Sequence, residues 1–197
     1  MNDITQIGAT AYGYYSRAKI MGGGMPVAAV VGRADVMRLA GRGGGVKFSG
    51  GTYSCHPASM LASRLMMEHL VAEEGRVYPL ISRLGQKARR TVEEAFRAEG
   101  IHAVCTGNGN DALPDSSMAA VHFPYDTQTA CEAPEQTRNP EVCDVELSDT
   151  VLQLALLLED VFVMHGLGSV SAAHTEEDIA LLGEACRKAG RRIAPLL

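Results

Sequence analysis

The chain has 197 residues, 46% of them hydrophobic, which suffices for a packed core and excludes an intrinsically disordered protein. Its net charge of -5 argues against nucleic-acid binding, which usually requires a basic face. The five cysteines are odd in number and show no CxxC spacing, so we expect free buried thiols rather than a zinc site or a disulfide framework.

No targeting or membrane segment is expected. The amino end has no basic segment followed by an apolar one, as a signal peptide would. The most apolar run, residues 154–164, is interrupted by Glu159 and Asp160 and is too short to span a bilayer. We therefore expect a soluble cytoplasmic protein that binds no membrane.

The first predicted element is a buried strand over residues 27–31, bounded by Pro26 and Gly32. Residues 1–18 are rich in Tyr and Gly and have no clear period. Asp35 is expected to start a short helix that runs to Leu39. The glycine-dense segment 41–51 predicts a loop.

Two helices are predicted next. Pro57 suits a first helical position, because its missing N–H would be unpaired there in any residue, and Gly75 marks the break between the helices. Gly100 ends the second helix. The first helix carries an apolar face of Met60, Leu61, Leu65, Met67, Leu70 and Val71. The second carries a stripe of Val77, Leu80, Ile81, Leu84, Ala88, Val92, Ala95 and Phe96, and a solvated side of Lys87, Arg89, Arg90, Glu93 and Glu94.

The last part of the chain predicts strands over 101–105 and 118–123, around a turn-rich segment at 107–114. Residues 124–144 are polar, carry three prolines and predict a mobile loop or a lid. Residues 147–163 predict a helix that is apolar almost all round and therefore well buried. Thr175 and Asp178 form a capping box that predicts the start of a final helix.

Three segments carry a family resemblance. KIMGGGMPVA (residues 19–28) is similar to the cofactor-lysine segment of class III, pyridoxal-phosphate-dependent aminotransferases, and most closely to that of the glutamate-1-semialdehyde 2,1-aminomutases. GGTYSCHPA (50–58) resembles the Gly-Thr segment of this family, which usually ends in Gly-Asn-Pro. SAAHTEEDI (171–179) resembles the start of its carboxy-terminal helix. The three segments occur in the family's order.

The resemblance implies roles for single residues. Lys19 would form the Schiff base with pyridoxal phosphate and move protons during transfer of an amino group. Thr52 would donate its hydroxyl to the cofactor phosphate across a dimer interface, and Gly51 would allow the close backbone approach. Glycines 22–24 would shape the turn beside the cofactor. His56, at the usual Asn position, is expected to be a structural histidine, and the remaining histidines lack metal-ligand spacing.

The resemblance also implies a fold and a domain order. The fold class would be α/β: a remnant of the fold type I aminotransferase large domain at residues 1–75, a connecting helix at 76–99, and a small α+β domain at 100–197. Family members are much longer before the lysine, and that part supplies further groups of the cofactor site. We therefore expect a partner to cover the apolar strand at 27–31, either a second copy of the chain or a complementary amino-terminal half.

Two functions follow as hypotheses. The chain is the carboxy-terminal portion of an enzyme that moves an amino group on a small amino-acid-like substrate, and the motifs suit an aminotransferase and an aminomutase alike. Alternatively, it is a truncated, inactive dimerisation module of the same lineage. A nucleotide-phosphate loop is disfavoured, because Gly24 is not followed by Lys-Ser/Thr and no G-x-G-x-x-G follows a strand.

Overall fold

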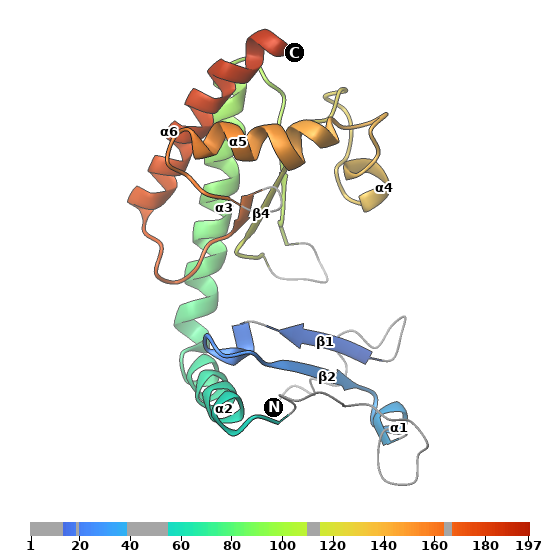
Figure 1. Cartoon of the computed structure of the whole chain (residues 1–197), viewed down its shortest axis with the longest axis vertical. Helices are drawn as coiled ribbons and strands as arrows, with labels where there is room; N and C mark the ends of the chain where they lie inside the picture. Colours follow the sequence, from blue (N-terminus) through green and yellow to red (C-terminus); the bar gives the residue numbers. More distant parts are fainter. Residues whose placement is uncertain (1–13, 19, 39–54, 110–114, 164–166) are drawn as a thin grey trace. The chain divides into compact units, whose positions relative to one another are not determined.

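The computed structural model describes residues 14–18, 20–38, 55–109, 115–163 and 167–197 (Figure 1). The chain divides into two compact units, Met1–Glu74 and Gly75–Leu197. The boundary falls beside the predicted end of the first domain at residue 75, while the assignment of 76–99 to a connecting helix stays a prediction. Within the described ranges, no helix combines the length and the apolar character that a bilayer span requires.

The first unit contains an antiparallel hairpin of β1 (Tyr14–Ala18) and β2 (Ala28–Gly32). β2 confirms the strand predicted at 27–31. β1 was missed because its strand conformation comes from pairing with β2 and not from a period-2 pattern of its own. The short helix α1 (Ala34–Met37) follows, as predicted.

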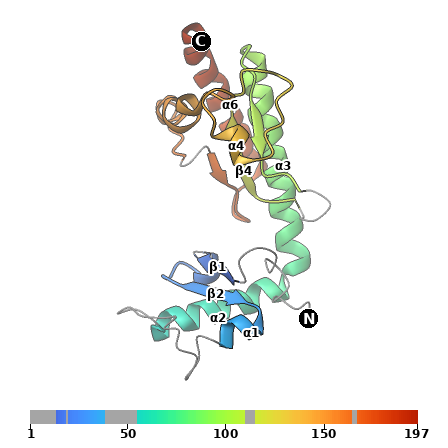
Figure 2. The same cartoon turned by 90° about the vertical axis from the view of Figure 1, so that its right-hand side faces the viewer.

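Helix α2 (Pro57–Ala72) begins at the predicted proline. It lies against η2, a short 3-10 helix at Ile20–Gly22, and Gly23 approaches the side chain of Met66 and the carbonyl of Ala62. Both views draw it beside the hairpin (Figure 2). Large apolar side chains of α2 are exposed, namely Met60, Leu61, Leu65, Met67 and Val71. Most residues of the predicted apolar face are therefore uncovered.

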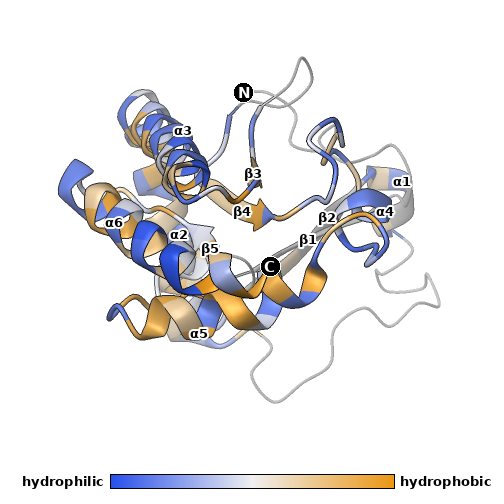
Figure 3. Cartoon of the chain, turned by 90° about the horizontal axis from the view of Figure 1, so that it is seen from above, coloured by the Kyte–Doolittle hydropathy of each residue, from blue (hydrophilic) through white to orange (hydrophobic). Residues whose placement is uncertain are grey.

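Helix α3 (Glu74–Ala98) opens the second unit and buries most of its predicted stripe. The break from α2 lies at Glu73, just before the predicted Gly75. The prediction was wrong for Arg89, placed on the solvated side, because its side chain is only 3% exposed. α3 reads as amphipathic in the hydropathy colouring (Figure 3).

The second unit contains a three-stranded antiparallel sheet in the order β3-β4-β5. β3 (Val104–Thr106) and β4 (Met118–His122) confirm the two predicted strands. Ala119 and Val121 of β4 are buried, as the period of a strand requires when one face meets the core. β5 (Leu167–Ser169) was missed because three residues, Leu-Gly-Ser, carry no strand pattern.

The helix predicted at 147–163 is shorter than expected. A π-helical turn, η4 (Leu147–Val151), leads into α5 (Leu152–Leu157). The chain then leaves the helix: Asp160 has φ +59°, and the amide of Val161 donates to the carbonyl of Leu156 at 3.0 Å. The expected burial is wrong in part, since Leu154, Leu157 and Leu158 are exposed. An all-round apolar pattern does not say which side meets the core.

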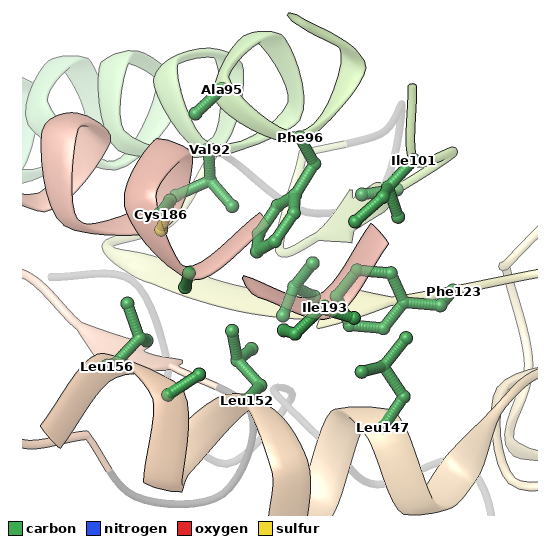
Figure 4. Packing of buried hydrophobic residues seen from close by; sticks show 14 of the residues in the cluster. Val92, Ala95, Phe96, Ile101, Phe123, Leu147, Leu152, Leu156, Cys186 and Ile193 are labelled. Atoms are coloured by element: carbon green, nitrogen blue, oxygen red, sulfur yellow. The ribbon is translucent and has the colours of Figure 1, made fainter. Parts of the chain in front are cut away.

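Helix α6 (Glu176–Ile193) lies side by side with α3. Gly183 makes this close approach possible, because a Cβ there would lie 2.4 Å from the Thr91 side chain. α3, α6, η4 and α5 enclose one core with the sheet, in which Phe96 and Phe123 meet edge to face at 5.2 Å between ring centroids (Figure 4). The short helix η5 (Ala194–Leu196) follows α6.

The predicted capping box of α6 is confirmed. Thr175 Oγ1 accepts from the amide of Asp178 at 3.3 Å, and Asp178 accepts from the amide of Thr175 at 2.7 Å. His174 closes the preceding turn, since its Nδ1 accepts from the amide of Ser171.

We expect Thr175→Ala to lower the free energy of unfolding by ~1 kcal/mol, because the replacement leaves a first-turn amide without its acceptor. Urea unfolding followed by circular dichroism measures the effect. Thr175→Ser retains the oxygen and serves as the control. Equal stability of the alanine and serine variants would contradict a stabilising cap.

Candidate functional site

The predicted catalytic residue, Lys19, lies outside the described residues, but both of its neighbours are described. Ala18 is the last residue of β1 and pairs with Ala28 of β2. Ile20 is the first residue of η2. In the sequence, Lys19 is the one residue between the end of β1 and the start of η2.

The glycines that follow the lysine form a tight turn. The amide of Met25 donates to the carbonyl of Gly22 at 2.9 Å, and Gly23 and Gly24 have φ values of +54° and +89°. These values favour glycine, because a Cβ would clash with the backbone in the left-handed region. Gly22 is buried against Val27, which begins the chain's return into β2. The conformation of the turn thus explains Gly23 and Gly24 without a ligand.

Gly51 and Thr52, the predicted phosphate-binding residues, also lie outside the described residues. Three residues after Thr52, Cys55 adopts φ +57°, and His56 then begins α2 as its N-cap. The resemblance predicts glycine at the position of Cys55. Cys55 nevertheless adopts the left-handed backbone conformation that glycine would favour. Such a residue is strained by about 1–2 kcal/mol.

The first turn of α2 contains polar groups without protein partners. The side chain of His56 is exposed and makes no capping hydrogen bond, and its expected structural role stays a prediction. The Ser59 hydroxyl is buried, with the residue 1% exposed, and has no hydrogen-bond partner. Uncapped amides at a helix amino terminus favour an anion. Sequence reasoning missed Ser59, which lies in an ordinary helical pattern.

A second polar centre surrounds Arg89 in the other unit. Its Nε donates to Asn108 Oδ1 at 2.7 Å, one Nη to the carbonyls of Ser116 and Met118 at 3.1 and 2.6 Å, and the other Nη to Asp115 Oδ1 at 2.6 Å. Hydrogen bonds from Gln86 and from the Gly109 amide, together with the Arg89 charge, lower the pKa of Asp115. Every guanidinium nitrogen is engaged by protein groups, so this centre holds the ends of a loop and does not offer a ligand site.

The sheet and the core of the second unit also contain titratable groups, among them His122, Cys105 and Cys186. His122 Nε2 lies 3.0 Å from Thr106 Oγ1, and burial lowers the pKa of His122. Across the described ranges, no group of three His, Cys, Asp or Glu residues is arranged to hold a metal ion. Cys55 is exposed, contrary to the expectation of buried thiols, whereas the other four cysteines are buried.

Comparison with curated proteins gives one consistent group of relatives. The chain is 32% identical over 170 residues to a glutamate-1-semialdehyde 2,1-aminomutase of Methanoculleus marisnigri and 31% identical over 182 residues to one of Sorangium cellulosum. These matches cover 85% and 87% of the chain but only 36% of either relative. The chain thus spans about a third of the length of these curated relatives. No protein-family model matches it.

Comparison with solved structures also finds aminotransferases. An omega-transaminase from Sphaerobacter thermophilus superposes with a TM-score of 0.66 at 27% identity, over 93% of this chain and 39% of that one. A beta-phenylalanine aminotransferase from Variovorax paradoxus superposes with a TM-score of 0.67 over 94% of this chain, and at 24% identity this likeness concerns the fold alone. The predicted fold class, a fold type I fragment, is thereby confirmed.

Proposed function

This chain belongs to the class III aminotransferase family as a counterpart of its carboxy-terminal part, and on that premise we propose that it is the carboxy-terminal portion of a pyridoxal-phosphate-dependent aminotransferase or aminomutase. The observation that carries the proposal is the match of 85% of the chain to an aminomutase, with the lysine and Gly-Thr segments in order. Its substrate would be a small amino-acid-like molecule.

Lys19 is the proposed catalytic residue. Pyridoxal phosphate, when bound, supplies an electron sink for bond breaking at the amine-bearing carbon of a substrate. Lys19 would hold the cofactor through its Nζ and carry a proton on the same atom. This role requires an unprotonated amine, so the surroundings would have to lower the lysine pKa from its free value of about 10.4. The position directly after a paired strand end supports the role, because the backbone of Ala18 is fixed.

The cofactor phosphate would be held by Thr52 and Gly51 ahead of α2. The start of α2 fits an anion, since His56 does not cap the helix with its side chain and the Ser59 hydroxyl has no partner. The left-handed Cys55 supports the same assignment, because it retains a turn conformation at the position of the family's glycine. We propose that the other groups of the cofactor site come from a second copy of the chain or from an amino-terminal half.

Borohydride trapping tests the proposal. The chain is incubated with pyridoxal phosphate, reduced, digested and mapped by mass spectrometry, with and without a co-expressed amino-terminal half of a relative. We expect the cofactor on the Lys19 peptide, at higher occupancy in the complemented sample. Labelling spread evenly over Lys47, Lys87 and Lys188, or no labelling in either sample, would contradict the proposal.

Thr52→Ala should weaken retention of pyridoxal phosphate roughly 10- to 100-fold, the loss expected for one hydrogen bond to a charged group. Equilibrium dialysis of the complemented sample measures it, with Thr127→Ala, an exposed threonine of the second unit, as the matched control. Thermal unfolding should stay unchanged in both variants. Unaltered retention in the Thr52 variant would remove this residue from the phosphate site.

The inactive dimerisation module remains the alternative. The exposed apolar side chains of α2 favour it, since such a surface promotes association. A stable dimer in sedimentation velocity, together with no trapped cofactor in either sample, would select this alternative.

A further inference from the structure

Helix α2 has one side that packs within its own unit and an opposite side that is exposed. On the packed side, a Cβ at Gly23 would lie 3.6 Å from the carbonyl oxygen of Ala62 and 3.5 Å from the Met66 methyl group. The Ser59 side chain is buried on the same side. Ser59, Ala62 and Met66 follow one another at steps of three and four residues, so they share one face of the helix.

The exposed side of α2 is apolar along most of its length. Its large side chains range from 38% exposed at Met67 to 70% exposed at Val71, and they belong to Met60, Leu61, Leu65, Met67 and Val71. They recur at steps of four and seven residues, which places them on one broad face. A broad exposed apolar face marks a surface for another protein.

An ion pair interrupts the apolar residues in the middle of this side. Arg64 Nε donates to Glu68 Oε1 at 2.7 Å, and the two side chains are 75% and 55% exposed. The two charges are opposite in sign, and residue 66 lies halfway between them in the sequence. An identical helix that runs in the opposite direction would therefore present the opposite charge at each of these two positions.

We propose that the exposed side of α2 binds the same side of α2 in a second copy of the chain, with the two helices antiparallel. The two-fold axis lies halfway between Arg64 and Glu68. Arg64 of each copy then faces Glu68 of the other copy, and Met60 of each copy faces Val71 of the other. A two-fold contact requires a surface that is complementary to itself, and this arrangement of charges and apolar side chains meets the requirement.

The charges determine both the orientation and the kind of partner. In a parallel pair, each arginine would face an arginine and each glutamate a glutamate, and the like charges would repel. In the antiparallel pair, Leu65 and Met67 meet their own equivalents beside the axis, between two contacts of opposite charge. Each Glu68 carboxylate can accept from the Arg64 of its own helix and from that of the other copy. A membrane or a nucleic acid would require a basic face, whereas this side carries one charge of each sign.

Charge reversal in the full chain tests this contact by sedimentation velocity. We expect the unaltered chain to form a dimer. Arg64→Glu places two carboxylates opposite each other at both contacts, and Glu68→Arg does the same with two guanidinium groups. Each variant alone should dimerise roughly 10- to 100-fold more weakly. An equimolar mixture of the two variants restores both contacts of opposite charge, so it should form a heterodimer with the affinity of the unaltered chain.

Arg187→Glu is the matched control. It changes the net charge as Arg64→Glu does and breaks an exposed ion pair with Glu184 on α6, but it should leave the dimer intact. Circular dichroism should show the same helix content in all variants.

Three results would overturn the proposal. The unaltered chain could be a monomer, including one that binds a co-expressed amino-terminal half, which would then be the occupant of this side. A dimer could tolerate both charge reversals, or the two variants could stay apart when they are mixed. The contact names one of the two partners that the proposed function allows, but it needs no pyridoxal phosphate. Failed dimerisation therefore leaves trapping at Lys19 untouched, and failed trapping leaves the dimer untouched.

Discussion

Replacing Lys19 with alanine should abolish covalent capture of pyridoxal phosphate by this chain, in every assembly that captures it at all. An imine with the cofactor's aldehyde needs a primary amine, and alanine has no amine. We expect the borohydride-trapped label to fall to background. Mass spectrometry of the intact protein measures it, because reduction makes the label permanent.

Two matched variants make this result specific. Lys19→Arg retains a positive charge but cannot form an exchangeable imine, so it should lose the label as completely as alanine. Lys87→Arg removes an exposed lysine that pairs with Glu176 and should retain full labelling. A Lys19→Ala protein that still carries label at one other lysine would show that the catalytic amine was assigned to the wrong residue.

The second large effect is expected in the other unit. Arg89→Met should lower the free energy of unfolding by roughly 3–5 kcal/mol, the cost of breaking a buried ion pair by removing one partner. Methionine removes the guanidinium donor from the Asp115 carboxylate, which keeps its hydrogen bonds from Gln86 and the Gly109 amide, and it also removes the Arg89 donor from the carbonyls of Ser116 and Met118. Urea unfolding followed by circular dichroism measures the loss, and hydrogen exchange should localise it to α3 and β4.

Arg187→Met is the control for this variant. Arg187 pairs with Glu184 on the exposed side of α6, where an ion pair contributes at most about 1 kcal/mol. Similar stabilities of the two variants would mean that the Arg89 centre does not hold the loop ends. Acid titration offers a second readout, because the lowered pKa of Asp115 means that its stabilisation is present above its unfolded pKa and is lost as the pH falls through the folded one.

Helices with a clear start signal or one clear apolar stripe could be predicted from the sequence. Pro57 marked the start of α2, the Thr175–Asp178 box marked the start of α6, and the stripe of α3 marked its buried side. These signals are local, so a single sequence contains them. β1 and β5 depend on partners elsewhere in the chain, and α5 is apolar on sides that the core does not reach, so local patterns failed there.

The candidate site was predictable only through the resemblance. Lys19, Gly51 and Thr52 were chosen because the sequences of their segments resemble the family's motifs. The structure describes the neighbours of these residues but not the residues themselves. Arg89 shows the opposite case. Its helical position next to Ala88 gave no sign that Asn108, Asp115 and two carbonyls would surround it. A buried arginine is determined by its distant partners, which helical periodicity does not report.

The contacts between α3 and α6 determine when the second unit can complete its folding. Lys87 bonds to Glu176, and Arg191 bonds to Glu99, across sequence separations of 89 and 92 residues. Such contacts close long loops and form late. During synthesis on the ribosome, α3 therefore emerges with Val92 and Phe96 uncovered, and the hydrophobic centre stays open until α6 has been translated. Chaperones that shield nascent apolar helices would be needed most during that interval.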